Sequence, residues 1–386
     1  MRKVLLWIGW SYVGCFILWL VLRFVFSDRL WSLLLVNAIA DSIFVPLSIL
    51  LIASLLFRCW RLLLGLSIPT IAFSLLIAAP FLPFFANAQL KNSPPLLSNI
   101  NAADTLFVCG RDEVFALKLT PNNGKPVKIW SWQAATSPGL PKLMVSKFAT
   151  TDECKPIEQG RKVLITSSTN GVALVDQTAG KTLFYGSVPG AHSADLLPND
   201  RIAVAGADSP IGGHTLVLFD LKVSDRPLWK TELYSGHGVY WDKTRRSLWA
   251  LGRYELRQYE LDRWESPAPE LKLKQSFPLP SPGGHDLAPT PGRSTLLITT
   301  DTDVLLFDLQ LNTFTSEPII KQLALVKSVD VHPVTNRLAY IQAEGGNWWS
   351  SRIHFLEPKQ SEPKQSETKQ TTLLPGERLY KARWVY

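Results

Sequence analysis

The chain has 386 residues, 46% of them hydrophobic, and its formal net charge at pH 7 is +8. Its lysines and arginines are scattered through turns and form no basic cluster, which argues against a nucleic-acid partner. The four cysteines show no CxxC spacing and no disulfide framework, so a zinc finger and a disulfide-stapled module are excluded.

Residues 1–88 are almost wholly apolar and predict an α-helical membrane segment. Arg2 and Lys3 precede the first apolar run, and Arg58 and Arg61 separate the second from the third. Positive flanks belong in the cytoplasm, so the N terminus is expected inside and the soluble remainder outside, in the periplasm or at the cell surface. About three transmembrane helices are expected, because these runs are long enough to cross a bilayer: 4–26, 30–57 and 62–85.

Two features of this leader permit other interpretations. Ala86-Asn87-Ala88 fits a signal-peptidase site, and cleavage after Ala88 would release the soluble domain. Asp41 is the only formal charge in the second run and would mark a functional membrane segment with the soluble domain as its sensor. A lone acid that faces a neighbouring helix, or a shorter span, is the simpler explanation of Asp41.

Residues 89–102 predict a linker, and the sequence behind it repeats at intervals of roughly 40 to 50 residues. The segment HSADLLPNDRIAVAG starts at His192, and related segments start at His237 and His285, about 45 and then about 48 residues further on. Degenerate copies begin near Glu153 and Lys327. Repeats of this length, each made of several short strands, are typical of a β-propeller.

Residues 103–386 are expected to form six blades. The first repeat has three apolar runs instead of four and lacks an innermost strand. The C-terminal segment 379–386 supplies one more strand, which would close the ring and remove its open sheet edges. The polar insert at 358–370 predicts a disordered surface loop. The fold class is therefore an all-β six-bladed β-propeller preceded by an α-helical membrane segment.

The first strand of each blade lines the channel of a propeller, so equivalent strand starts meet at one mouth although they lie far apart in sequence. This position is occupied by His192, His237 and His285. Three neutral imidazoles form a candidate site for a divalent metal such as manganese, zinc or iron. Glu153 or Asp286 would complete its coordination.

Cationic side chains are expected near the same mouth and favour an anionic ligand such as a uronate or a phosphate. The predicted ligand-binding residues are Glu153, Lys155, Lys327, Lys381 and Arg383. A second explanation is architectural: the repeat reproduces an ancestral histidine whose ring hydrogen-bonds the next blade. The remaining histidines are expected to be surface or turn residues, and these are His214, His332 and His354.

Cys109, at the end of the second strand of the first blade, should come near Cys154, which starts the first strand of the second blade. In an oxidising compartment the two would be able to form a disulfide, and Cys154 would then not be a ligand. The sequence leaves the paired and the unpaired state open.

The soluble part resembles a bacterial family of uncharacterised six-bladed propellers, a domain of unknown function. The resemblance covers nearly all of residues 103–386 and rests on LFVCGRDEVFAL, WSWQA, DECKP, KVLITSSTNGVAL, AHSADLLPNDRIAVA, GHGVYWDK, LWALG, GGHDLAP, VKSVDV and WWSSRIHFL. It implies the fold and no established activity.

More remotely, the histidine-lined mouth is similar to that of oligogalacturonate lyases. Those propellers hold a divalent metal with histidines and cleave acidic sugar chains by β-elimination. The analogy implies that His192, His237 and His285 are metal ligands and that a lysine or arginine acts at the α-carbon. The spacing of the histidines differs from that family, so the reaction type does not transfer.

Two classes of function remain. The first is a membrane-anchored, extracytoplasmic propeller that binds an anionic, carbohydrate-like ligand at the histidine-lined mouth, with a metal-dependent lyase or hydrolase as its catalytic form. The second is a non-catalytic propeller that scaffolds protein partners or serves as a sensor. No catalytic residue follows from the sequence.

Overall fold

The computed structural model describes residues 3–4, 6–13, 104–120, 125–357 and 369–385. The chain divides into two compact units, Met1–Leu96 and Leu97–Tyr386. The described residues of the first unit are helical, and no helix within the described residues is long and apolar enough to cross a membrane. The predicted spans beyond residue 13, Asp41, the cleavage site after Ala88 and the linker lie outside the described residues and stay predictions.

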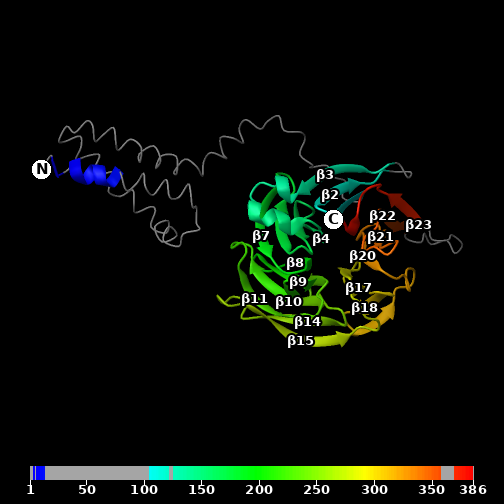
Figure 1. The fold of residues 1–386 in the computed structure, drawn as a ribbon. Helices are drawn as coiled ribbons and strands as arrows, with labels where there is room; N and C mark the ends of the chain where they lie inside the picture. Colours follow the sequence, from blue (N-terminus) through cyan, green and yellow to red (C-terminus); the bar gives the residue numbers. More distant parts are fainter. Residues whose placement is uncertain (1–2, 5, 14–103, 121–124, 358–368, 386) are drawn as a thin grey trace. The chain divides into compact units, whose positions relative to one another are not determined.

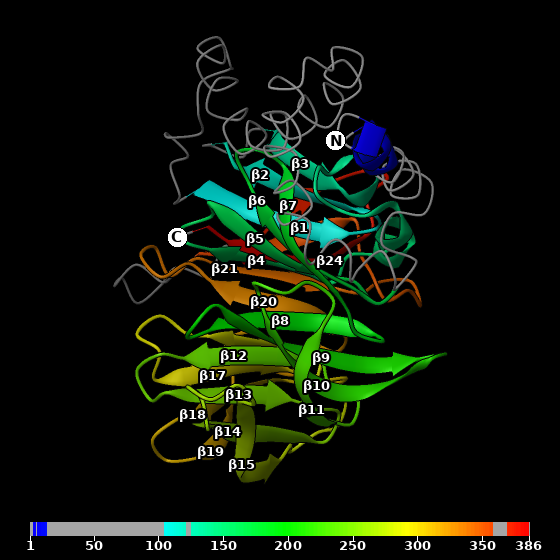
Figure 2. The ribbon, with the colours of Figure 1, turned by 90° about the vertical axis from the view of Figure 1, so that its left-hand side faces the viewer.

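The second unit consists of six four-stranded antiparallel sheets arranged around a central axis (Figure 1, Figure 2). The predicted all-β six-bladed propeller is therefore confirmed. The first three blades contain, from the axis outwards, β24 (Leu379–Trp384), β1 (Thr105–Gly110), β2 (Glu113–Lys118) and β3 (Val127–Gln133); β4 (Glu153–Ile157), β5 (Lys162–Thr166), β6 (Gly171–Asp176) and β7 (Lys181–Ser187); and β8 (Ala191–Leu197), β9 (Arg201–Ser209), β10 (Gly212–Asp220) and β11 (Pro227–Glu232).

The other three blades follow the same order from the axis outwards. They contain β12 (Gly238–Asp242), β13 (Ser247–Leu251), β14 (Glu255–Asp262) and β15 (Glu270–Pro278); β16 (Asp286–Pro289), β17 (Thr295–Thr299), β18 (Val304–Asp308) and β19 (Thr313–Ser316); and β20 (Val326–Val331), β21 (Leu338–Gln342), β22 (Arg352–Leu356) and β23 (Lys369–Leu373).

The ring closes where the end of the chain meets its first described strand. β24 pairs antiparallel with β1, with Leu106 opposite Trp384 and Cys109 opposite Lys381. Every residue of both strands is buried. The last strand of the chain thus completes the first blade and removes the edge that β1 would otherwise expose.

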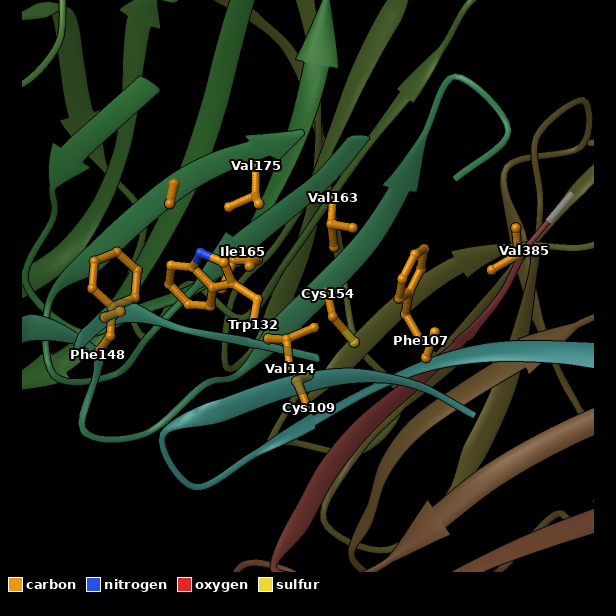
Figure 3. Close-up of a cluster of buried hydrophobic side chains, with 13 residues drawn as sticks. Phe107, Cys109, Val114, Trp132, Phe148, Cys154, Val163, Ile165, Val175 and Val385 are labelled. Carbon is orange, nitrogen blue, oxygen red and sulfur yellow. The ribbon is translucent and has the colours of Figure 1, made fainter. Parts of the chain in front are cut away.

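The hydrophobic core lies between neighbouring blades, because each sheet packs against another sheet on both faces. Between the first two blades the cluster includes Phe107, Trp132 and Val163 (Figure 3). Cys109 and Cys154 belong to the same cluster, and both are free thiols in the described residues. The expected proximity of the two cysteines is present, but the optional disulfide is not. Burial raises the pKa of the Cys154 thiol, which keeps it in its neutral form.

Two short 3₁₀ helices, η4 (Ala134–Thr136) and η5 (Lys142–Phe148), connect β3 to β4. Met144 and Phe148 of η5 are buried, and the Phe148 ring meets Trp132 edge to face with the centroids 5.4 Å apart. No periodic pattern in the sequence indicated these helices, since turns this short bury only a few side chains.

Candidate functional site

Each innermost strand contacts the innermost strand of the next blade, so that six strands surround the channel: β4, β8, β12, β16, β20 and β24. They run in the same direction along the axis, so their first residues meet at one mouth and their last residues at the other. His192 lies at the start of β8, while His237 and His285 directly precede β12 and β16. The end of the channel lined by these histidines and Lys327 is called the histidine mouth below.

The three imidazole rings of the histidine mouth lie side by side. The ring centroids of His192 and His237 are 4.3 Å apart, and those of His237 and His285 are 5.5 Å apart. Burial lowers the pKa of His192 and of His237, so both rings are neutral at pH 7. The repeat has therefore placed three imidazoles from three consecutive blades within one cluster.

Hydrogen bonds to the backbone fix the tautomers of His192 and His237. Nδ1 of His192 lies 2.7 Å from the carbonyl oxygen of Gly190, and Nδ1 of His237 lies 2.9 Å from that of Ser235. A carbonyl oxygen only accepts, so in both neutral rings Nδ1 carries the proton. The lone pair on Nε2 is then available to a hydroxyl group or a metal ion.

His285 has a different environment, because its Nε2 lies 2.8 Å from Oδ1 of Asp301 and 3.0 Å from Nζ of Lys327. Nε2 is able to donate to the carboxylate or to accept from the amine, but not both at once. Burial, with the charge of Lys327, lowers the pKa of His285 to about 4. Burial also lowers the pKa of Lys327 to about 8.

Aromatic rings flank the same mouth. Tyr380 is buried, and its ring centroid lies 6.0 Å from that of His192. The indole of Trp348 packs edge to face on Tyr380 at 5.7 Å, and Trp348 remains 43% exposed. Trp348 is thus linked to the imidazoles through Tyr380, and its exposed indole has an apolar ring face that is open to a ligand.

Beneath the histidine mouth, two acids and two bases fill the channel and are called the ion plug below: Glu153, Asp286, Lys381 and Arg383. Arg383 donates from Nε to Oε1 of Glu153 at 2.8 Å and from Nη2 to Oδ1 of Asp286 at 2.6 Å. Nζ of Lys381 lies 3.0 Å from Oδ1 of Asp286 and 3.5 Å from Oε2 of Glu153. All four side chains are buried.

The ion plug is electrically neutral, with two negative and two positive charges. Burial alone would raise the pKa of Glu153 and of Asp286, but the charges of Arg383 and Lys381 hold both below their usual values. The carboxylates also accept hydrogen bonds from the Ser193 hydroxyl at 3.1 Å and the Val329 amide at 3.0 Å. The plug therefore separates the two mouths with fully partnered charges.

The predicted site residues fall into three groups along the channel. His192, His237, His285 and Lys327 form the histidine mouth, whereas Glu153, Lys381 and Arg383 belong to the ion plug. Lys155 lies nearer the opposite mouth, where Nζ is 3.2 Å from Oδ2 of Asp195 and donates to the Val239 carbonyl at 2.8 Å. Asp286, considered above as a metal ligand, is paired with Lys381 and Arg383.

Sequence reasoning missed Asp301, Trp348 and Tyr380. Asp301 lies in the turn between β17 and β18, and Trp348 lies in the segment between β21 and β22. None of the three occupies a position that recurs in other repeats. Only Tyr380 could have been found from the sequence, because it immediately precedes Lys381, a predicted site residue, in the closing strand.

The other histidines were expected to be surface or turn residues; His332 does lie at a turn but is buried there, and His354 is buried within a strand. His332 is 2% exposed, and its Nδ1 accepts from the backbone amides of Val334 and Thr335. His354 is 7% exposed within β22, where its Nδ1 lies 2.9 Å from the Thr371 hydroxyl. Their partners come from the folded turn and from β23, which the sequence pattern does not show. His214 lies in β10 with a positive φ of 54°.

Within the described residues, no group of three or more His, Cys, Asp or Glu side chains is arranged to hold a metal ion. His192 and His237 suit a metal, since both present an unprotonated Nε2. Nε2 of His285, however, already contacts Asp301 and Lys327. Metal binding by these three histidines stays a prediction.

The closed ring of six antiparallel sheets defines a β-propeller. The chain belongs to a family of unknown function, DUF6528, whose sequence profile matches residues 116–386. No curated protein matches the chain. Among solved structures it is similar to Kuenenia stuttgartiensis hydrazine synthase, with a TM-score of 0.43 and 12% identity over 58% of this chain and 66% of that chain.

Proposed function

We propose that this propeller binds a small anionic, carbohydrate-like ligand at the histidine mouth. The observation that carries the proposal is the cluster of three imidazoles and Lys327 around the channel axis, directly above the ion plug. A neutral plug gives a ligand a closed floor, so the ligand enters and leaves by the same mouth.

The histidine mouth offers a chemical partner for each type of group in a sugar acid: its carboxylate, its hydroxyl groups and its ring. No carboxylate of the described residues lies within ion-pair distance of Lys327, and beside its contact with Nε2 of His285 the ammonium group has further donors for a ligand carboxylate. Nε2 of His192 and of His237 would accept hydrogen bonds from hydroxyl groups. The exposed indole of Trp348 would cover the apolar face of a sugar ring.

The test is calorimetric titration of the full chain with digalacturonate, with neutral galactobiose as the comparison ligand. Lys327→Met should weaken digalacturonate binding at least about tenfold, because one charge-assisted contact is lost. Lys272→Met is the matched control, since Lys272 is an exposed lysine on β15. Equal binding by wild type and Lys327→Met, or no binding at all, would contradict the proposal.

A second candidate is a divalent metal at the same mouth, favoured by the backbone hydrogen bonds that leave Nε2 of His192 and His237 unprotonated. His192, His237 and His285 would hold the ion. When bound, it would act as a Lewis acid on the ligand carboxylate, which would acidify the neighbouring C–H bond, so lyase and hydrolase activity on polyuronides are the reactions to assay.

Elemental analysis of the purified full chain tests the metal directly. Near-stoichiometric manganese, zinc or iron in the wild type and none in the triple variant His192→Ala, His237→Ala, His285→Ala would support it. No metal in either protein, with the variant still folded by circular dichroism, would leave a ligand-binding propeller without a metal.

We also propose that the apolar leader anchors the propeller outside the cytoplasm, on the strength of the positive residues that flank its predicted spans. Added protease should digest the propeller on spheroplasts with an intact inner membrane. Digestion only after lysis would place the propeller on the cytoplasmic side.

A further inference from the structure

The opposite mouth of the channel contains a cavity of about 370 Å³. It lies on the axis, because the innermost strand of every blade contributes to its lining: Lys155, Leu196, Trp241, Pro289, Asp330 and Arg383. A cavity of this volume is within the range of small-molecule sites in proteins.

The ion plug separates this cavity from the histidine mouth. Arg383 belongs to both the plug and the cavity lining, and both carboxylates of the plug hold its guanidinium group. The cavity is therefore distinct from the histidine mouth. Residues of either site can be substituted without altering the other site.

Most of the charges around the cavity are paired within the protein. Lys155 lies 3.2 Å from Asp195, and Glu158 lies 2.6 Å from the ammonium group of Lys162. Asp330 is buried and accepts hydrogen bonds from the amides of Trp384 and Val331. These groups give the cavity a structured floor of hydrogen-bonded and ion-paired side chains.

Two cations of the lining are the exception. Lys243 and Arg293 are exposed, and no carboxylate of the described residues lies within ion-pair distance of either. Lys243 follows β12, and Arg293 lies in the turn between β16 and β17 with a positive φ of 55°. The cavity thus has two uncompensated positive charges and no uncompensated carboxylate among its exposed groups.

The walls of the cavity include apolar side chains. Leu196, Trp241, Leu287 and Pro289 line it, and Trp241 is almost fully buried in the core between the third and fourth blades. Such walls suit the body of a ring-shaped ligand, and the two cations suit a dianion.

We propose that this mouth binds a small phosphate monoester with a ring-shaped body. A phosphate monoester carries a charge of about −1.5 to −2 at pH 7, which two cations neutralise. The planar guanidinium of Arg293 suits two phosphate oxygens, and Lys243 adds a second point charge. The ring-shaped body lies against Leu196 and Pro289, two apolar lining residues that are partly exposed.

Calorimetric titration of the full chain with glucose 6-phosphate and with phenyl phosphate tests this assignment. The double variant Lys243→Glu, Arg293→Glu should weaken binding at least about tenfold. The matched control is Lys222→Glu, Arg226→Glu, which makes the same charge change at two exposed cations in the turn between β10 and β11. This control should retain wild-type affinity.

Leu196→Trp is a second variant that fills the cavity and leaves its charge unchanged, and it should also abolish binding. Lys327→Met should leave phosphate-ester binding unchanged, which separates this site from the histidine mouth. The proposal is overturned if neither ester binds the wild type, if inorganic phosphate binds as tightly as both esters, or if the Lys243 and Arg293 variant binds like the control.

Discussion

Arg383 bridges two buried carboxylates that share only one other cation, Lys381, in the ion plug. Its guanidinium contacts both Glu153 and Asp286, and Lys381 shares the same two partners. A buried ion network of this kind adds little net stability over a hydrophobic core, but removal of one member strands a charge in a medium of low polarity.

Arg383→Met should therefore lower the free energy of unfolding by about 3–5 kcal/mol. Denaturant unfolding of the full chain, followed by circular dichroism, measures the change. Arg263→Met is the control, because Arg263 pairs with Glu270 at 2.8 Å on the surface and its side chain is 57% exposed. The control should cost less than about 1 kcal/mol. Equal effects of the two substitutions would contradict the role of the plug.

Asp330 predicts a pH dependence of the opposite sign to that of an ion-paired acid. Burial raises its pKa to about 7 although two backbone amides donate to its carboxyl group. The folded state therefore holds this proton more tightly than the unfolded state, whose pKa is near 3.8. The resulting stabilisation is complete below pH 4 and is lost as the pH rises through 7.

Asp330→Asn removes this titration. The stability of the wild type relative to the variant should fall by on the order of 2 kcal/mol between pH 5 and pH 8. The substitution also removes an amide hydrogen bond, whose cost shifts the stability difference between wild type and variant by a constant. The change of that difference with pH therefore reports the titration of Asp330. Urea unfolding at several pH values gives that slope, and a constant difference would show that the carboxyl titrates normally.

At the scale of elements, β24 holds both ends of the propeller together. It supplies the innermost strand of the first blade and brings Lys381 and Arg383 into the plug. Its six residues are buried, as are those of β1 beside it. Loss of this strand would expose a hydrophobic edge and leave Glu153 and Asp286 without cations.

Deletion of residues 379–386 should abolish cooperative unfolding of the propeller, because the edge of β1 and two buried charges lose their partners. A synthetic peptide of residues 374–386 should restore it in trans. The same peptide with Lys381→Met and Arg383→Met should restore it less, which separates the plug from the strand pairing. Cooperative unfolding of the truncated chain would show that ring closure by β24 is dispensable.

At the scale of the whole molecule, the two mouths should bind their ligands independently. The plug is fully hydrogen-bonded and neutral, and a ligand at either end gains nothing from moving it. Saturating glucose 6-phosphate should change the dissociation constant of digalacturonate by less than about twofold. A larger change in competition calorimetry would reveal coupling through the channel or a shared site.

The period of the repeats in the sequence is enough to determine the propeller architecture. Recurring segments at His192, His237 and His285 indicated the number of blades, and the short first repeat identified the closing strand. The same alignment placed the three imidazoles together, because equivalent strand starts lie on one circle around the axis. Sequence periodicity is informative here because each blade repeats one local pattern of strands and turns.

Only the tertiary structure decides how far along the channel each charged side chain lies and which partner it pairs with. Lys155 lies two residues beyond Glu153 on the same face of β4, which moves it about 6–7 Å towards the other mouth. The pairing of Glu153 with Arg383 joins strands that are 230 residues apart. No repeat contains that information, because a charge selects its partner by distance across the folded channel and not by position in the chain.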